Sequence, residues 1–226
     1  MVVYMCSYAG LCLSIILALD TTSAPVAIGM QYTAAIWLFL ANLLKTRKFH
    51  IRAFVPVAII FIGVVFFMCS GGDAASQTGN FIALSEGIFF ALMTVSAKKV
   101  AGTNPIGLTA VANLFTGIIV FPLFPGTLGK ISVMTSMDWI IMLVLGIIQI
   151  AAGYACYNVG IQKISAQKAS VIALWEMILG PVWVALFLKE YPTPMVLTGF
   201  IIILLGMLLD SLMNSDTSKS PQKQRL

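Results

Sequence analysis

Long apolar stretches, separated by a few turn-forming or charged residues, follow one another through almost the whole chain. A helix needs about 20 mainly apolar residues to cross the hydrocarbon core of a bilayer, and each stretch approaches that length. In lipid, a helix satisfies its backbone polar groups within the segment. The sequence therefore predicts an all-α polytopic membrane helix bundle with eight transmembrane helices, over residues 4–19, 25–44, 52–70, 80–98, 106–125, 137–160, 168–188 and 194–213.

Composition and motifs exclude several classes of protein. Charged residues make up 9% of the chain, whereas soluble domains carry about 25%. The positive charge lies in loops and at the C-terminus rather than in one basic patch, which argues against nucleic acid as a partner. The four cysteines show no CxxC spacing, and no HExxH, GxSxG, GxGxxG or P-loop motif occurs. We therefore expect no metal site, no cofactor and no enzymatic activity.

The basic residues also predict an orientation. If loops alternate between the two sides, one side receives both termini and every Lys and Arg except Lys130 and Lys189. Cytoplasmic loops are enriched in Lys and Arg, so we expect both termini in the cytoplasm and the protein in a plasma (inner) membrane. Residues 214–226 are polar and basic, which predicts a disordered cytoplasmic tail.

Two pairs of segments indicate an internal repeat. ALDTTSAPVA (18–27) parallels GIQKISAQKA (160–169), and VPVAIIFIGVVFF (55–67) parallels TGFIIILLGMLLD (198–210). In the second pair, Pro56 precedes Gly63 by seven residues and Gly199 precedes Gly206 by seven, so each pair marks one helix face that another helix can approach closely. The copies are five helices apart, an odd number, and must therefore point in opposite directions.

This pattern predicts an inverted five-helix repeat with its first copy incomplete. Residues 79–213 would form a complete second copy, and residues 1–70 the last three helices of the first. Two helices would then be missing upstream of Met1. Either the chain is a fragment, or a homodimer completes the bundle. Secondary transporters are built from such inverted repeats, with the substrate site near the bilayer midplane.

The chain resembles the drug/metabolite transporter superfamily, EamA type. The resemblance rests on ALDTTSAP, GNFIALSEGIFFALMTVSAKK (79–99), GYACYNVGIQKISA (153–166), the segment from Glu176 to Glu190, and TGFIIILLGMLL (198–209). It implies ten helices in two inverted units. Here Met177 stands where the family often has proline, Lys45 stands where it often has glutamate, and the first two helices of the pattern are absent.

Two glutamates lie inside predicted spans. A charged side chain at mid-bilayer costs roughly 2.5–3.5 kcal/mol, so Glu176 must face a cavity, be paired, or be protonated. Its alternatives are a binding group for substrate or proton and a packing hydrogen bond between helices. Glu86 is either a cavity residue or a partly hydrated interfacial one. With no Lys or Arg in the spans beside them, the pair favours a cation, a zwitterion or a proton over an anion. Gln31 falls opposite Glu176 under the repeat.

Other polar and aromatic residues in the spans are candidates for lining a path. Gln149, Gly153 and Tyr157 share one arc of helix 137–160, with Tyr154 and Asn158 on the adjoining arc. A water-lined cavity and interhelical hydrogen bonding explain them equally well, and the same holds for Asn113. Trp175 either stacks on an organic substrate or packs between helices. Gly180-Pro181 interrupts the seventh span and, with Gly153, is a candidate hinge.

The sequence as a whole predicts a secondary transporter of a small organic metabolite, such as an amino acid, an amine or a drug-like compound, working by alternating access. Its partners would be that substrate and the lipid bilayer. The alternative is a truncated or non-transporting membrane protein that keeps the fold without a working cavity.

Overall fold

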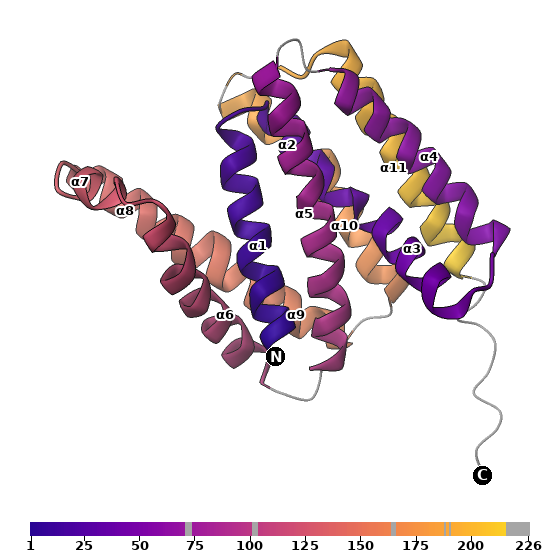
Figure 1. Cartoon of the computed structure of the whole chain (residues 1–226), viewed down its shortest axis with the longest axis horizontal. Coiled ribbons are helices and arrows are strands. Elements are labelled where there is room, and N and C mark those ends of the chain that lie inside the picture. The colour runs from indigo at the N-terminus through magenta and orange to yellow at the C-terminus, as the bar shows by residue number, and fades with distance from the viewer. Residues whose placement is uncertain (71–73, 101–103, 164–165, 188, 190, 216–226) are drawn as a thin grey trace. The chain divides into compact units, whose positions relative to one another are not determined.

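All regular structure in the described part of the chain is helical (Figure 1). The computed structural model describes residues 1–70, 74–100, 104–163, 166–187, 189 and 191–215, so the predicted tail lies almost wholly outside it. The elements are α1 (Val2–Leu19), α2 (Ala24–Met30), η1 (Gln31–Thr33), α3 (Ala34–Thr46), α4 (Ile51–Cys69), α5 (Ala74–Lys99), α6 (Pro105–Val120), η2 (Phe121–Leu123), α7 (Thr127–Ile131), α8 (Ser136–Val144), η3 (Leu145–Ala152), α9 (Gly153–Lys163), α10 (Ala166–Phe187) and α11 (Pro194–Ser215).

Seven helical stretches are long and apolar enough to cross a membrane, which confirms the all-α membrane class. They are Val2–Leu19, Ala24–Thr46, Ile51–Cys69, Ser76–Ala97, Ile106–Leu123, Ser136–Tyr157 and Pro194–Met213. The remaining predicted span, 168–188, coincides with α10, in which the described apolar stretch is the shorter Ile178–Phe187. The described residues thus give seven candidate spans where the sequence predicts eight.

Side-chain hydrogen bonds cap the starts of α6 and α8. Thr135 and Asp138 form a capping box at the start of α8, in which each side chain accepts a hydrogen bond from the other residue's backbone N–H. At α6, the Asn104 side chain accepts hydrogen bonds from the backbone N–H groups of Ile106 and Gly107, and Pro105 occupies the first helical position. The loops therefore fix where α6 and α8 enter their spans.

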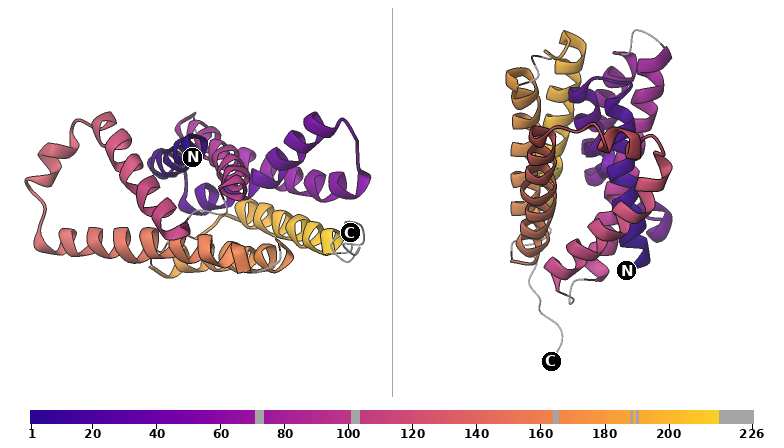
Figure 2. Two further views of the ribbon diagram at one scale, coloured as in Figure 1. Left: turned by 90° about the horizontal axis from the view of Figure 1, so that it is seen from below. Right: turned by 90° about the vertical axis from the view of Figure 1, so that its left-hand side faces the viewer.

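The helix breaks differ from those that the sequence predicts. The expected interruption at Gly180-Pro181 is wrong, because α10 continues as an α-helix through Pro181. The predicted helix 25–44 is instead broken at η1, a 3₁₀ turn. In helix 137–160, the π-helical η3 joins α8 to α9 in one continuous rod (Figure 2). Short 3₁₀ and π segments inside longer helices often mark functional positions.

By its contacts the chain divides into two compact units. The first unit is Met1–Leu13 with Leu92–Ser165, and the second is Ser14–Ala91 with Ala166–Leu226. Each unit therefore combines segments from both predicted repeats. In the second unit, a buried apolar cluster joins α1, α2, η1, α4, α5 and α11, with Met30, Ile60, Phe67 and Ile203 at its centre.

Within the second unit, α4 and α11 lie side by side (Figure 1). A Cβ atom placed on Gly206 would lie 2.7 Å from Ile60 Cγ1, 3.0 Å from the Pro56 carbonyl oxygen and 3.1 Å from Ile60 N. A Cβ atom placed on Gly63 would lie 2.5 Å from Ile203 Cγ1, 2.8 Å from the Gly199 carbonyl oxygen and 3.1 Å from Ile203 N. The two glycines thus have closely matching surroundings, and the close helix approach predicted at both pairs is confirmed.

These matching contacts make the helix pair locally two-fold symmetric. The same spacing in sequence separates Pro56 from Gly199, Ile60 from Ile203 and Gly63 from Gly206. The start of α4 faces the later part of α11, and the middle of α4 faces the start of α11, so the two helices are antiparallel. We call this contact the α4–α11 seam.

The loops leading into the seam also match. Arg47 after α3 and Lys189 after α10 have φ angles of 53° and 55°, and they are the non-glycine residues with positive φ in the described chain. The following helices begin at Ile51 and Pro194, which are again separated by the spacing that relates the glycines. A left-handed residue at a helix end reverses the chain direction within a short turn.

Candidate functional site

Glu86 is the fully buried charged residue of the described structure. It lies in α5, its side chain is 0% exposed, and neither Oε1 nor Oε2 has a hydrogen-bond partner among the described residues. The alternative of a partly hydrated interfacial glutamate is therefore wrong. Burying an ionised carboxylate without a partner is very costly, so such a position suits a protonated acid or a carboxylate that binds a cationic group.

The polar residues near Glu86 on α5 are satisfied, unlike Glu86 itself. Asn80 Nδ2 donates a hydrogen bond to the Phe67 carbonyl oxygen at 3.1 Å, and Thr22 Oγ1 donates to Asn80 Oδ1 at 2.5 Å. Ser85 Oγ lies 2.8 Å from Ser14 Oγ. The side chains of Asn80 and Ser85 thus have hydrogen-bond partners, whereas the Glu86 carboxyl group has none among the described residues.

The 3₁₀ turn η1 packs against α5 at Gly87, the residue that follows Glu86. A Cβ atom on Gly87 would overlap Thr33 Oγ1 and lie 3.0 Å from the backbone nitrogen of Ala34, so only glycine allows this approach. Thr33 is fully buried, and its hydroxyl donates to the Met30 carbonyl oxygen at 2.8 Å. Discontinuous membrane helices place free backbone groups at depth, where transporters bind substrates and ions.

Glu176, Trp175 and Gln31 belong to the same unit. Glu176 is exposed, and Tyr32 of η1 lies near enough for the phenol and the carboxyl group to interact electrostatically. Trp175 is 61% exposed, and its choice between stacking on a substrate and packing between helices stays a prediction. Gln31 is half-buried at the start of η1. The sequence separation between Gly63 and Gly206 of the seam is also that between Thr33 and Glu176. Under the repeat, Thr33 rather than Gln31 is therefore equivalent to Glu176.

The first unit contains a separate aromatic and amide cluster. Tyr8 of α1 is 0% exposed, donates a hydrogen bond from its hydroxyl to Asn113 Oδ1 at 3.0 Å, and meets Tyr154 edge to face at 4.9 Å between ring centroids. Tyr4 stacks on Tyr8 at 6.3 Å. The structure thus brings the predicted Asn113 and Tyr154 together through Tyr8, a residue that sequence reasoning missed. The sequence pattern that could have identified Tyr8 is the pair Tyr4 and Tyr8, which are four residues apart inside an apolar span.

The other predicted residues of helix 137–160 are not drawn into that cluster. Gln149 lies in η3 and is exposed, and a Cβ atom on Gly153 would meet nothing within 4 Å. The side chain of Asn158 lies outside the described residues. The predicted site residues therefore fall into two groups, with Glu86, Glu176, Trp175 and Gln31 in the second unit and Asn113, Gln149, Tyr154 and Asn158 in the first.

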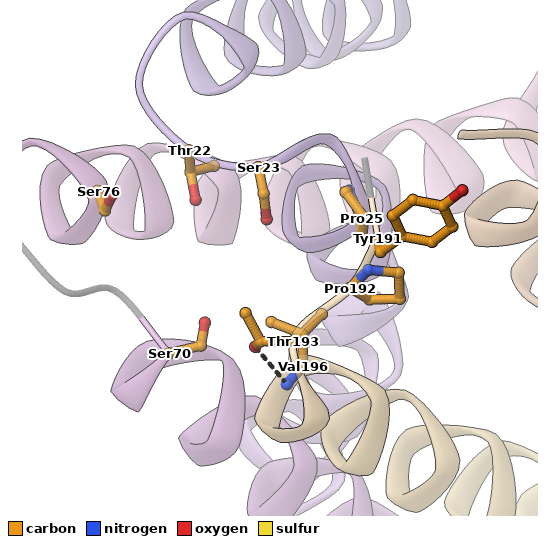
Figure 3. Close-up of a pocket in the computed structure, with 9 residues that line it drawn as sticks. All are labelled: Thr22, Ser23, Pro25, Ser70, Ser76, Tyr191, Pro192, Thr193 and Val196. Carbon is orange, nitrogen blue, oxygen red and sulfur yellow. Dashed lines mark hydrogen bonds between the residues drawn. The ribbon is translucent and has the colours of Figure 1, made fainter. Parts of the chain in front are cut away.

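A polar cavity of about 390 Å³ opens in the second unit where α4 ends and α11 begins (Figure 3). Its walls are rich in hydroxyl groups, which come from Thr22, Ser23, Ser70, Ser76, Tyr191 and Thr193. Thr193 Oγ1 also accepts a hydrogen bond from Val196 N at 3.3 Å, which caps α11. The sequence shows these residues only as polar breaks between spans. Among the lining residues that the structure describes, the Tyr191 phenol is the one ionisable group.

Known proteins resemble this chain at the level of a family and of a distant relative. Residues 77–212 match the EamA-like transporter family. An uncharacterized transporter from Synechocystis sp. is 26% identical over 200 residues, which cover 83% of this chain and 57% of that protein. The chain thus spans less than two thirds of that relative's length. No solved structure matches.

Proposed function

Because the chain belongs to the EamA-like transporter family, a non-enzymatic family of membrane transporters, we propose that it is a secondary transporter of a small organic cation or zwitterion. The observation that carries this proposal is Glu86, a buried carboxyl group that has no hydrogen-bond partner in the described part of a chain that crosses the bilayer. An intramembrane ionisable residue is by default a functional one. Amino acids and organic amines carry the positive charge that such a group would bind.

The proposed mechanism is alternating access between two inverted repeats, over eight spans that include α10. The local two-fold symmetry of the α4–α11 seam supports the repeat, because an inverted repeat requires equivalent helices to meet in opposite directions. The similar left-handed turns at Arg47 and Lys189 support it at the loops. Under this proposal residues 1–70 belong to one repeat and residues 79–213 to the other.

Within this mechanism Glu86 exchanges a proton for the cationic group of the substrate. An unpaired carboxylate would be too costly in the buried site, so the proton leaves only as the positive group arrives. Glu176, near Tyr32, supplies a second carboxyl group on the same unit. The break at η1 lies against Gly87, the residue that follows Glu86.

The remaining candidates are assigned to the path and to gating. Asn113 and Tyr154 are fixed by Tyr8, and we assign them to the walls of the path together with Gln149, Asn158, Gln31 and Trp175. The hydroxyl-lined cavity of Figure 3 lies at the end of α4 opposite the basic loop before it, so we assign it to the external mouth. Gly180, Pro181 and Gly153 remain candidate hinges.

The test is substrate-driven proton movement in vesicles that contain the purified protein and an internal pH indicator. A panel of amino acids and organic amines is added outside, one at a time. We expect at least one compound to change the internal pH with the wild-type protein, and Glu86→Gln to reduce that signal to background. Glu176→Gln should weaken it, whereas Asp20→Asn, which removes an exposed carboxylate at the end of α1, should leave it intact.

Two outcomes would contradict the proposal. Unchanged coupled flux in Glu86→Gln would remove Glu86 from the mechanism. Absence of flux for every compound with folded wild-type protein would favour the alternative of a protein that keeps the fold without a working cavity.

A further inference from the structure

A second cavity, of about 230 Å³, lies at the other end of α4, where the basic loop meets the last turns of α11. Its rim carries the basic or polar side chains of Lys48, His50, Arg52 and Asn42, and its floor includes Phe39 and Met213. All of these residues belong to the second unit. The proposed transport mechanism makes no use of this cavity.

The loop that presents the basic side chains is held by its own hydrogen bonds. Arg47 is left-handed, and its N–H donates to the Leu43 carbonyl oxygen at 2.8 Å, which ends α3. The Lys48 backbone N–H donates to Thr46 Oγ1 at 3.4 Å, and His50 Nδ1 donates to the Lys48 carbonyl oxygen at 3.2 Å. These bonds use backbone groups and the His50 ring and leave both the Lys48 ammonium and the Arg52 guanidinium exposed at the rim.

The charge of the cavity is positive. None of the described residues that line it is acidic. On α11, Asp210 lies about one turn before Met213 and is half-buried. A cavity with one guanidinium, one ammonium and an amide on its rim matches the oxygen atoms of a phosphate group.

Apolar surface continues directly from the basic rim. Phe39, Phe49 and Phe54 form an aromatic cluster with ring centroids 5.1–6.4 Å apart. Phe49 and Leu44 remain 57% and 79% exposed, and Ile51 remains 61% exposed. A free phosphate ion would gain nothing from this surface, whereas an amphiphile would place its acyl chains there.

We propose that this cavity is a binding site for the phosphate headgroup of an anionic phospholipid, with the acyl chains lying along Phe49, Phe54 and Leu44. The positive-inside rule puts this end of α4 at the cytoplasmic leaflet, where anionic lipids give a negative surface potential that attracts basic side chains. The proposal concerns lipid rather than substrate and does not depend on the transport mechanism.

The test compares purified variants in mild detergent with added phosphatidylglycerol or phosphatidylcholine. We measure melting temperature and, by native mass spectrometry, the number of lipids retained. For the wild type we expect phosphatidylglycerol to stabilise more than phosphatidylcholine. In Lys48→Gln/Arg52→Gln the affinity for phosphatidylglycerol should fall about 10- to 30-fold, at roughly one kcal/mol per basic residue.

The control variant Lys45→Gln/Lys163→Gln removes two exposed positive charges that do not line the cavity. It should keep wild-type affinity for phosphatidylglycerol. An equal loss in the control would overturn the proposal, since the effect would then be general charge attraction. Equal stabilisation by millimolar inorganic phosphate without lipid would also overturn it, because the site would then bind a free anion.

Discussion

Glu86 and Gly87 are neighbours on α5 with different roles. Glu86 supplies a buried carboxyl group for which the described residues offer no hydrogen-bond partner, and Gly87 lets η1 approach α5 closely. The glycine is required for space, because Thr33 Oγ1 occupies the volume of a Cβ atom there. The proposed site therefore depends on Glu86 for its carboxyl group and on Gly87 for the space that η1 occupies.

We predict that Gly87→Ala destabilises the protein by about 1–3 kcal/mol, the usual cost of overpacking an interior contact. Thr33→Ala should recover part of that loss in the double variant, since it removes the overlapping hydroxyl. Gly117→Ala is the matched control, because nothing lies within 4 Å of its Cβ position in α6. Thermal unfolding in detergent measures all of these variants. If Gly87→Ala is as stable as Gly117→Ala, the close contact between η1 and α5 is absent.

At the scale of helices, the α4–α11 seam is the contact with the clearest internal order. Its glycines touch equivalent atoms of the opposite helix, and the backbones approach so closely that a side chain at either position would collide with a carbonyl oxygen. Lipid offers no hydrophobic driving force between helices, so close packing of small residues is what holds such a pair together.

Gly63→Ala and Gly206→Ala should therefore destabilise the protein by similar amounts, about 1–3 kcal/mol each. Equivalent surroundings predict equivalent costs. Gly146→Ala in η3 is the control, because its Cβ position is open. Chemical unfolding in detergent gives the comparison. A large loss at one glycine and none at the other would mean that the seam is not symmetric.

At the scale of the whole molecule, the sequence predicts the features that the lipid bilayer imposes on the chain. Bilayer thickness sets helix length, so hydropathy located the seven spans, and the seven-residue spacing of Pro56, Gly63, Gly199 and Gly206 located the seam. The break at η1 was missed because Gln31, Tyr32 and Thr33 are not helix breakers. The contact between Tyr8 and Asn113 joins residues 105 positions apart and has no local signal. The burial of Glu86 likewise depends on its neighbours in space.

Cysteine accessibility in intact cells tests whether α4 and α11 cross the bilayer in opposite directions with the basic end of the seam inside. Single cysteines replace His50, Ser70, Thr193 and Met213 in a chain whose Cys6, Cys12, Cys69 and Cys156 are serine. We predict that a membrane-impermeant maleimide labels positions 70 and 193 from outside, and positions 50 and 213 only after permeabilisation. Labelling of positions 50 and 70 from the same side, or of 50 and 193 together, would contradict it.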